Sequence, residues 1–468
     1  MIPPMTLLYD IAYFFAAIFA APFLALKSYR TGKYRTDWPA RFGRIRNAQP
    51  LALEDYQALK HKGQEPLCLM LHCVSVGELN STRLLVDRLL ATEPRLNLVI
   101  TTTTDTGTNR SRELYSRPEY SSRVRTCRYP LDFSFAVNAF LRQVQPDAVA
   151  LVELEAWPNF TAIARRRGIP TCIINGRLTM RSFKRYNAVR VVTRSMLRRM
   201  EFITAQTPTI AQRFQALGAR DQTLTVLPTL KYDAADFTEH SDEARALAAA
   251  TGVSQEHLLL VGGSVAPGED TALLECYETL RHQFPNLRLA LAPRRPENNA
   301  VARRAIERAG LHVVARSAHP DGATRLPLTT GEVLLLDTLG ELKHLYRLAF
   351  MVFVGRSLTP MGGSDMIEAA ALAKPSCFGP HTDNFAQAVE LLTGNNAAVI
   401  VPTPAALTLL TAYFLNHPQQ AEAMGRRARD VVWQQRGSTD KTVEMLLNML
   451  RAKTGATCVV AAPLAQSA

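Results

Sequence analysis

The sequence predicts an α/β protein built from two Rossmann-like domains. The chain has 468 residues, which is too long for one ordinary hydrophobic core. Short apolar runs bounded by turn residues alternate with helical stretches along both halves of the chain. Many of these runs are apolar without interruption, as in strands that are buried on both faces of a parallel sheet.

Eleven strands are expected, five in the first half and six in the second. They are Leu67–Leu71, Asn97–Thr102, Ala148–Leu154, Thr171–Asn175 and Phe202–Ala205, then Leu258–Val261, Leu287–Ala292, Val333–Leu336, Met351–Val354, Pro375–Phe378 and Ala397–Val401. The stretch Tyr232–Ser254 is polar and has no strand, so the domain junction is placed there. The predicted division is an anchor and basic linker over 1–35, one domain over 36–233 and a second over 255–453.

An apolar run near the N-terminus is expected to hold the protein at a membrane. Leu7–Leu26 contains a single charge, Asp10, and is about as long as a hydrocarbon core is thick, although Pro22 also interrupts it. Basic residues follow the run, which places the two domains in the cytoplasm. A single membrane-spanning anchor is the first interpretation. A helix lying in the membrane interface and a buried core helix are the alternatives.

The positive charge of the chain is concentrated in its first half. Through Asp233 there are 33 Lys and Arg against 18 Asp and Glu, a net +15, and the remainder carries 21 against 23, a net −2. Such a half attracts anionic lipid, a phosphorylated substrate or nucleic acid. No RNA-binding motif is present, so nucleic acid ranks last. The seven scattered cysteines contain no Cys-x-x-Cys pair, so neither a zinc site nor a disulfide framework is expected.

Chemistry is expected where strands end, because open parallel sheets bind ligands at the carboxyl ends of their strands. In the first half, Glu78 follows the first strand at a helix start, as a general base or as a residue stabilised by the helix dipole. Glu153 and Glu155 follow the third strand, as a functional pair or a solvated one. A run of eight basic residues comes after the fourth strand and suits an anionic lipid or the phosphates of an acceptor: Arg177, Arg181, Lys184, Arg185, Arg190, Arg194, Arg198 and Arg199.

In the second half, four turns after strands are suited to phosphate or nucleotide binding. They are glycine-rich or carry arginine, and their backbone amides and guanidinium groups can hold an anion. The candidate nucleotide-binding residues in these turns are Gly263, Ser264, Arg294, Gly355, Ser357, Gly362, Gly363, Glu368 and Asn384. One such turn is a weak signal, whereas four in one domain are a specific one.

The order of these motifs resembles a known family. HCVSVGE (72–78), ELEAWPN (153–159), NGRLTMRSFKRY (175–186), LKYD (230–233), PRRPE (293–297), LGELKHLY (339–346), GRSLTPMGG (355–363) and GPHTDNF (379–385) together resemble the 3-deoxy-D-manno-octulosonic acid (Kdo) transferases, from about Leu7 to Val431. The resemblance implies a GT-B architecture, with two Rossmann-like domains facing a central cleft. It also implies an inverting transfer of Kdo from CMP-Kdo to a lipid A precursor at the cytoplasmic face of the inner membrane, with no metal and no cofactor.

The resemblance also assigns roles to single residues. Glu78 corresponds to the general base and Glu155 to a second carboxylate of the cleft. Arg294, Ser357 and Glu368 fall on positions that contact CMP, with Glu368 on the ribose. The donor loops depart from the family pattern, for example at Ser264-Val265-Ala266 and around Gly363. These departures leave two alternatives: a glycosyltransferase that uses another activated sugar, and an inactive relative that binds lipid.

Overall fold

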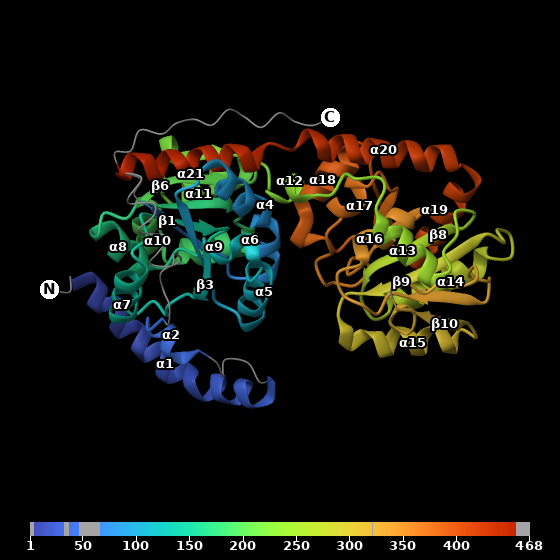
Figure 1. The fold of residues 1–468 in the computed structure, drawn as a ribbon, viewed down its shortest axis with the longest axis horizontal. Helices are drawn as coiled ribbons and strands as arrows, with labels where there is room; N and C mark the ends of the chain where they lie inside the picture. Colours follow the sequence, from blue (N-terminus) through green and yellow to red (C-terminus); the bar gives the residue numbers. More distant parts are fainter. Residues whose placement is uncertain (1–3, 32–36, 46–65, 321, 455–468) are drawn as a thin grey trace. The chain divides into compact units, whose positions relative to one another are not determined.

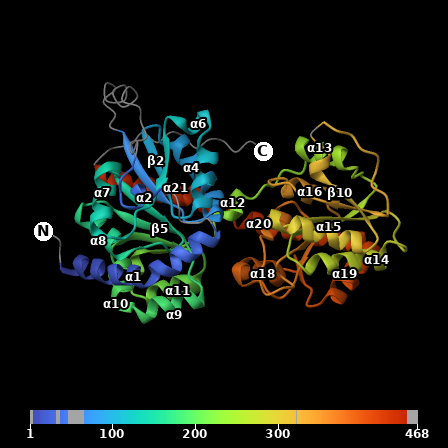
Figure 2. The same cartoon turned by 90° about the horizontal axis from the view of Figure 1, so that it is seen from below.

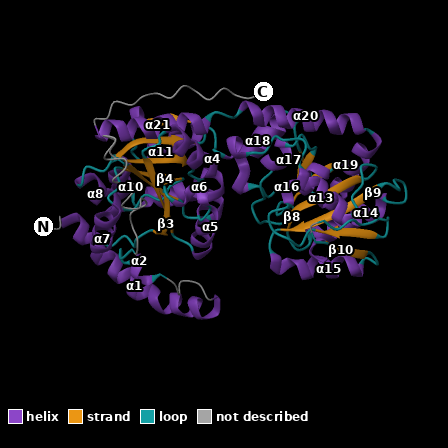
Figure 3. Ribbon diagram, viewed as in Figure 1, coloured by secondary structure: helices purple, strands orange, loops and turns teal. Residues whose placement is uncertain are grey.

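The computed structural model describes residues 4–31, 37–45, 66–320 and 322–454. The chain divides into two compact units, Met1–Ala234 with Gly437–Ala468, and Ala235–Arg436 (Figure 1). Each unit contains a parallel sheet of seven strands with helices packed around it (Figure 3). The prediction of an α/β chain with two Rossmann-like domains is therefore confirmed.

The first sheet has the strand order β3-β2-β1-β4-β5-β6-β7. β2 and β4 are buried along their whole length, and β1 is buried at every residue except Cys68, because both faces of the sheet are covered by helices. The strands are β1 Leu67–His72, β2 Leu96–Thr102, β3 Val124–Arg128, β4 Ala148–Val152, β5 Thr171–Gly176, β6 Met200–Ala205 and β7 Leu224–Val226.

Alternating side chains of these strands build two separate cores. Leu69 and Leu71 pack with α4 and α21, whereas Met70 packs with α7 and α8 on the other face. The helices of this unit are α1 Pro4–Thr31, α2 Trp38–Arg41, α4 Val76–Thr92, α5 Asp105–Tyr115, α6 Pro118–Ser121, α7 Ser134–Val144, α8 Pro158–Arg166, α9 Met180–Ala188, α10 Arg190–Leu197, α11 Pro208–Ala216, α12 Lys231–Ala234 and α21 Ser438–Thr454.

The second sheet has the strand order β10-β11-β9-β8-β12-β13-β14. Its strands are β8 Leu258–Val265, β9 Leu287–Pro293, β10 His312–Ala315, β11 Glu332–Leu335, β12 Met351–Val354, β13 Ser376–Phe378 and β14 Val399–Ile400. The helices around it are α13 Asp242–Thr251, α14 Glu269–Leu280, α15 Asn299–Arg308, α16 Leu342–Leu348, α17 Ile367–Ala371, α18 Ala386–Gly394, α19 Pro404–Asn416 and α20 Pro418–Gln434.

All eleven expected strands are present, and three further strands, β3, β7 and β10, lie at or next to a sheet edge. One expected strand ends early. β4 was predicted to continue to Leu154, but Glu153 has a left-handed backbone with φ of 61°, which terminates the strand at Val152. Glu153 and Glu155 therefore lie beyond the strand, and strand alternation does not decide which way their side chains point.

The last helix belongs to the first unit, which differs from the predicted second domain over 255–453. Val443, Leu446 and Leu450 of α21 are buried in the same core as Leu85 of α4, so burial of this apolar face ties residues 438–454 to the first sheet. At the other boundary, α13 lies within the stretch predicted as the junction, and it belongs to the second unit.

Helix α1 runs along the outside of the first unit and packs on α7 and α8 (Figure 2). The Asp10 carboxylate accepts hydrogen bonds from the backbone N–H of Ser134 (2.8 Å) and from the Asn159 amide (2.9 Å). The Tyr13 hydroxyl donates to Asp132 (3.0 Å). The one charge of the apolar run thus caps α7 and docks α1 onto the unit.

Among the described residues, no helix is long and apolar enough to cross a membrane. The transmembrane span predicted over Leu7–Leu26 therefore finds no support in the structure. Part of the predicted basic linker lies outside the described residues.

Candidate active site

Glu78 lies in the first turn of α4, directly after the carboxyl end of β1. Ser75 is the N-cap residue, and its hydroxyl accepts from the Glu78 backbone N–H. The Glu78 carboxylate in turn accepts from the Val74 backbone N–H and from the Ser75 hydroxyl, both at 2.8 Å. This reciprocal arrangement resembles a capping box, and it fixes the carboxylate at the strand–helix turn.

The environment of Glu78 favours a carboxyl group that can exchange its proton near neutral pH. The pKa of Glu78 is raised to about 7, mainly by burial and also by the nearby Glu153 and Glu155 carboxylates, while the hydrogen bonds from Val74 and Ser75 oppose the shift. A general base works best when its pKa lies near the operating pH. The group therefore has the acidity that proton abstraction needs.

Glu78, Glu153 and Glu155 form one acidic cluster, because β1 and β4 are neighbours in the sheet. Burial raises the pKa of Glu153, and the cations Arg177 and Lys231 oppose that shift. Burial also raises the pKa of Glu155, against a hydrogen bond from the Trp157 indole. The sequence indicated Glu153 only as one of a pair with Glu155 and assigned it no role of its own, whereas the structure places it in the same cluster as Glu78.

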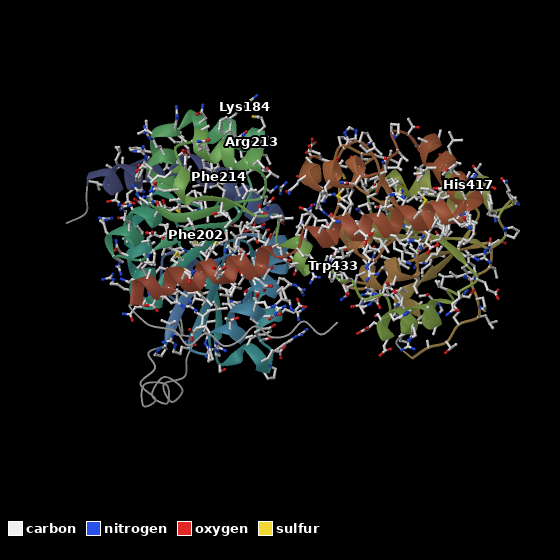
Figure 4. The ribbon with its side chains drawn as sticks, turned by 90° about the horizontal axis from the view of Figure 1, so that it is seen from above. Lys184, Phe202, Arg213, Phe214, His417 and Trp433 are labelled. Atoms are coloured by element: carbon white, nitrogen blue, oxygen red, sulfur yellow. The ribbon has the colours of Figure 1, made fainter. Side chains whose placement is uncertain are left out.

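The basic run extends from this edge of the first sheet. α9 contains no buried residue, and Tyr186 ties it to the acidic loop through a hydrogen bond to the Leu154 carbonyl (3.5 Å). Six cations on α9, α10 and the turn after them are exposed, and within the described ranges none of them has an ion-pair partner: Arg181, Lys184, Arg185, Arg190, Arg194 and Arg198. Lys184 points outward at the border of the unit (Figure 4).

In the second unit, the candidate turns gather at the carboxyl ends of β8, β12 and β13. Gly355 N–H donates to the Gly263 carbonyl (2.8 Å), and Asn384 N–H donates to the Gly362 carbonyl (3.0 Å). A Cβ on Gly362 would lie 2.2 Å from the Asn384 amide, and a Cβ on Gly263 would lie 2.0 Å from the Tyr346 hydroxyl. These glycines are required by close packing, which makes the edge rigid.

A buried carboxylate that was not among the candidates organises this edge. Glu269, the first residue of α14, accepts hydrogen bonds from four backbone N–H groups. The donors are Ala266 (2.8 Å), Arg356 (2.6 Å), Ser357 (2.7 Å) and Leu358 (2.9 Å). Glu269 thus fixes the turn after β12. The one signal in the sequence that could have identified Glu269 is its position directly after Gly268, at the start of a helix.

Three arginine side chains come together above this turn. Arg356 has a left-handed backbone, with φ of 60°. Burial lowers the pKa of Arg356, and the like charges of Arg294 and Arg295 lower it further. Arg294, Glu368 and Asp365 all lie within electrostatic range of the buried Tyr346 hydroxyl, whose pKa is raised mainly by burial. Arg294 and Glu368 thus lie near the same buried hydroxyl, and three guanidinium groups at one sheet edge suit a phosphate.

Ser357 and Ser264 are placed differently from each other. Ser357 is fully buried, and its hydroxyl donates to the Val354 carbonyl (2.6 Å) and accepts from the Gly379 N–H (2.9 Å). These bonds join the ends of β12 and β13. Ser264 is half-buried and has a left-handed backbone, with φ of 55°.

In the part of the chain that the structure describes, no group of three or more His, Cys, Asp or Glu side chains could hold a metal ion.

The acidic cluster of one unit and the glycine-rich, arginine-lined edge of the other both lie at the carboxyl ends of strands, where open α/β sheets bind their ligands. Solved structures share this fold at low sequence identity. A glycosyltransferase from Rickettsia africae matches 84% of this chain and 100% of its own, with a TM-score of 0.57 and 12% identity. The UDP-GlcNAc 2-epimerase of Neisseria meningitidis matches 82% and 100%, with a TM-score of 0.56 and 12% identity. The fold alone therefore does not separate transferase from epimerase.

Sequence comparison makes that separation. Residues 36–234 match the model of a family described as 3-deoxy-D-manno-octulosonic-acid transferase. The 3-deoxy-D-manno-octulosonic acid transferase of Bordetella pertussis is 30% identical over 90% of this chain and 93% of its own length. That of Haemophilus influenzae is 28% identical over 91% and 94%. The chain belongs to the 3-deoxy-D-manno-octulosonic acid transferase family, and it is a glycosyltransferase.

Proposed function

We propose that this chain transfers Kdo from CMP-Kdo to a lipid A precursor, with inversion at the anomeric carbon. Membership of the Kdo transferase family supports the reaction. The roles of base and donor-binding group are assigned from one observation. One unit has a buried carboxylate with a pKa of about 7, and the other has clustered guanidinium groups.

The reaction needs one base and one group of cations. Glu78 accepts the proton of the acceptor hydroxyl as its oxygen bonds to the anomeric carbon of Kdo. The bond between that carbon and the CMP phosphate oxygen breaks, and CMP leaves with the electron pair. Arg294, Arg295 and Arg356 are suited to stabilise the negative charge of this leaving group.

Replacing Arg294 with alanine should weaken CMP binding by about 1.5–3 kcal/mol, the usual contribution of a charge-assisted hydrogen bond. Isothermal titration calorimetry with CMP measures the change. Arg303→Ala, which removes an exposed arginine from α15, is the matched control and should bind CMP like the wild type. If UDP or GDP binds the wild-type chain more tightly than CMP, the donor is another activated sugar.

The exposed cations of α9 and α10 support a phosphorylated lipid as the acceptor. They lie beside exposed apolar side chains, namely Met180, Val189 and Val191. α9 is also joined to the loop that carries Glu155. A surface with both unpaired cations and apolar groups fits an acceptor that has both phosphates and acyl chains.

For membrane attachment, we propose that α1 lies in the interface of the cytoplasmic leaflet of the inner membrane. One face of α1 docks on the unit, while large apolar side chains on the other face are exposed: Leu7, Leu8, Ile11, Phe14, Phe15, Ile18, Phe19 and Phe23. Phe19 is 80% exposed. Trp38, Phe42 and Phe135 of the same unit form a second exposed apolar group, in which the three rings stack in a row. Contiguous apolar surface of this kind marks a membrane interaction site.

The triple replacement Phe14→Ser, Phe15→Ser and Phe19→Ser should reduce binding to lipid vesicles at least tenfold, because each buried phenylalanine contributes about 1.5–3 kcal/mol. Co-sedimentation in high salt measures the bound fraction without the contribution of the basic surface. Leu326→Ser with Leu409→Ser, at exposed positions of the second unit, is the control and should bind normally. Unchanged binding of the triple variant would show that the attachment lies elsewhere.

A further inference from the structure

A pocket of about 770 Å³ opens in the first unit, away from the acidic cluster. Its walls are the starts of β5 and β6, the end of α8 and the last turns of α21. Glu78 and Glu155 follow the carboxyl ends of β1 and β4. All strands of a parallel sheet run in the same direction. The pocket, at the amino ends of β5 and β6, therefore lies at the opposite end of the strands from these carboxylates.

The lining of this pocket carries an excess of positive charge. Arg165, Arg199, Arg220 and Lys453 line it, and the only acidic side chain among its lining residues is Glu201. No ion pair among the described residues involves any of the four cations. A pocket with this excess of unpaired cations selects an anionic ligand.

Arg199 turns away from the exposed basic run and into this pocket wall. Its guanidinium donates only to neutral oxygens, namely the Pro158 carbonyl (3.3 Å), the Thr161 hydroxyl (2.9 Å) and the Ser195 hydroxyl (2.8 Å). These bonds fix its orientation but leave its charge uncompensated. Burial lowers the pKa of Arg199, the nearby Tyr9 side chain opposes this shift, and the like charges of Arg165 and Arg166 lower the pKa further.

The pocket also has an apolar side. Phe202 lies next to α21 and packs against the core beneath it (Figure 4). Met445 and Met449 of α21 and Ile169 before β5 complete this side. The cavity therefore offers guanidinium groups for an anion and apolar surface for the remainder of the same molecule.

We propose that this pocket binds a phosphate ester, at a site separate from the donor site of the second unit. Guanidinium groups match phosphate oxygens in bidentate geometry, and the ammonium of Lys453 adds a point charge at the mouth. The phosphate belongs to an anionic lipid headgroup or to a soluble phosphorylated molecule. In either case the ligand bridges α8 and α21, the helix that returns to this unit from the end of the chain. The site does not depend on the identity of the sugar donor.

Hydrogen exchange of the full chain, followed by mass spectrometry, tests this site. The probes are sn-glycerol 3-phosphate, phosphatidylglycerol vesicles, and phosphatidylcholine vesicles as the neutral reference. Phosphate binding should slow exchange in peptides covering the end of α21 and the start of β6. The double variant Arg165→Gln with Lys453→Gln should weaken this protection about tenfold or more, since it removes two charge-assisted contacts. Both positions are exposed, and neither makes a hydrogen bond that the fold uses.

The matched control is Arg142→Gln with Lys441→Gln, which removes the same charge from exposed positions of α7 and α21 outside the pocket. It should leave the protection unchanged. Protection by glycerol phosphate supports a soluble ligand, and protection by phosphatidylglycerol vesicles alone supports a lipid headgroup. Absence of protection with both phosphate probes overturns the proposal. So does an equal loss of protection in the pocket variant and the control, because the binding would then be a general effect of surface charge.

Discussion

Replacing Glu78 with glutamine should lower the rate of sugar transfer by about 10²–10⁴-fold, the usual contribution of general-base catalysis. Glutamine keeps the shape of the side chain and can still accept from the Val74 N–H, but it cannot take a proton. CMP affinity should be unchanged, because the nucleotide candidates lie in the other unit. Steady-state transfer assays with CMP-Kdo, together with calorimetry of CMP binding, measure both quantities.

The pH dependence separates a catalytic Glu78 from a helix cap. The pKa of Glu78 is raised from 4.5 to about 7, so the wild-type rate should rise as the pH increases through 7, and the variant should lose this limb. Because the folded-state pKa exceeds the unfolded value of 4.5, Glu78 makes the protein less stable as the pH rises from 4.5 to about 7, and this loss is fully present above pH 7. Glutamine should therefore not destabilise the protein at pH 8.

A purely structural cap gives the opposite results. In that case Glu78→Gln would transfer sugar at close to the wild-type rate and would melt at a lower temperature at pH 8. Glu155 would then be the next candidate for the base. Glu93→Gln, at the other end of α4, is the control for the loss of a buried carboxylate and should keep its transfer rate.

The sequence predicted the buried parallel strands well, because their apolar runs need no partner to be recognised. It missed β3, where only Val124 and Arg128 are buried, and the short β7, which has no fully buried residue. Such strands are specified by pairing with a neighbour rather than by their own pattern. The return of α21 to the first unit was also missed. Its apolar stripe predicts a buried face, but it does not say which sheet covers that face.

Site prediction selected residues where a suitable residue type follows a strand, as for Glu78, Arg294 and Glu368, and the roles of these residues stay predictions. It did not identify Glu269 and Arg356, whose positions follow from a turn that closes on a distant helix end. Ser357 shows the converse limit. Its place in the motif implied contact with the nucleotide, whereas its hydroxyl is used inside the protein to join two strand ends.

Replacing Glu269 with glutamine should destabilise the second unit and abolish most CMP binding. A carboxylate accepts from four N–H groups here, whereas a glutamine amide presents one oxygen, and its NH₂ group would face donors. Each carboxylate oxygen accepts from two of these N–H groups, so glutamine leaves two of them unpaired. Each unpaired buried N–H group costs about 1–3 kcal/mol, so the loss should be roughly 2–6 kcal/mol. Denaturant unfolding measures this free energy.

The effect on CMP should exceed what destabilisation alone explains, because Glu269 sets the turn that places Arg356 beside Arg294 and Arg295. Calorimetry at low temperature, where the variant is folded, should show CMP binding weakened more than tenfold, as for the loss of one charge-assisted contact. Asp270→Asn is the matched control. Asp270 is also buried in the first turn of α14, but it accepts only from the nearby Gly268 and Thr271 N–H groups. The Asp270→Asn variant should lose some stability and keep its CMP affinity.

If folded Glu269→Gln binds CMP like the wild type, the turn after β12 holds its shape without this carboxylate, and the arginine cluster is positioned by the sheet alone.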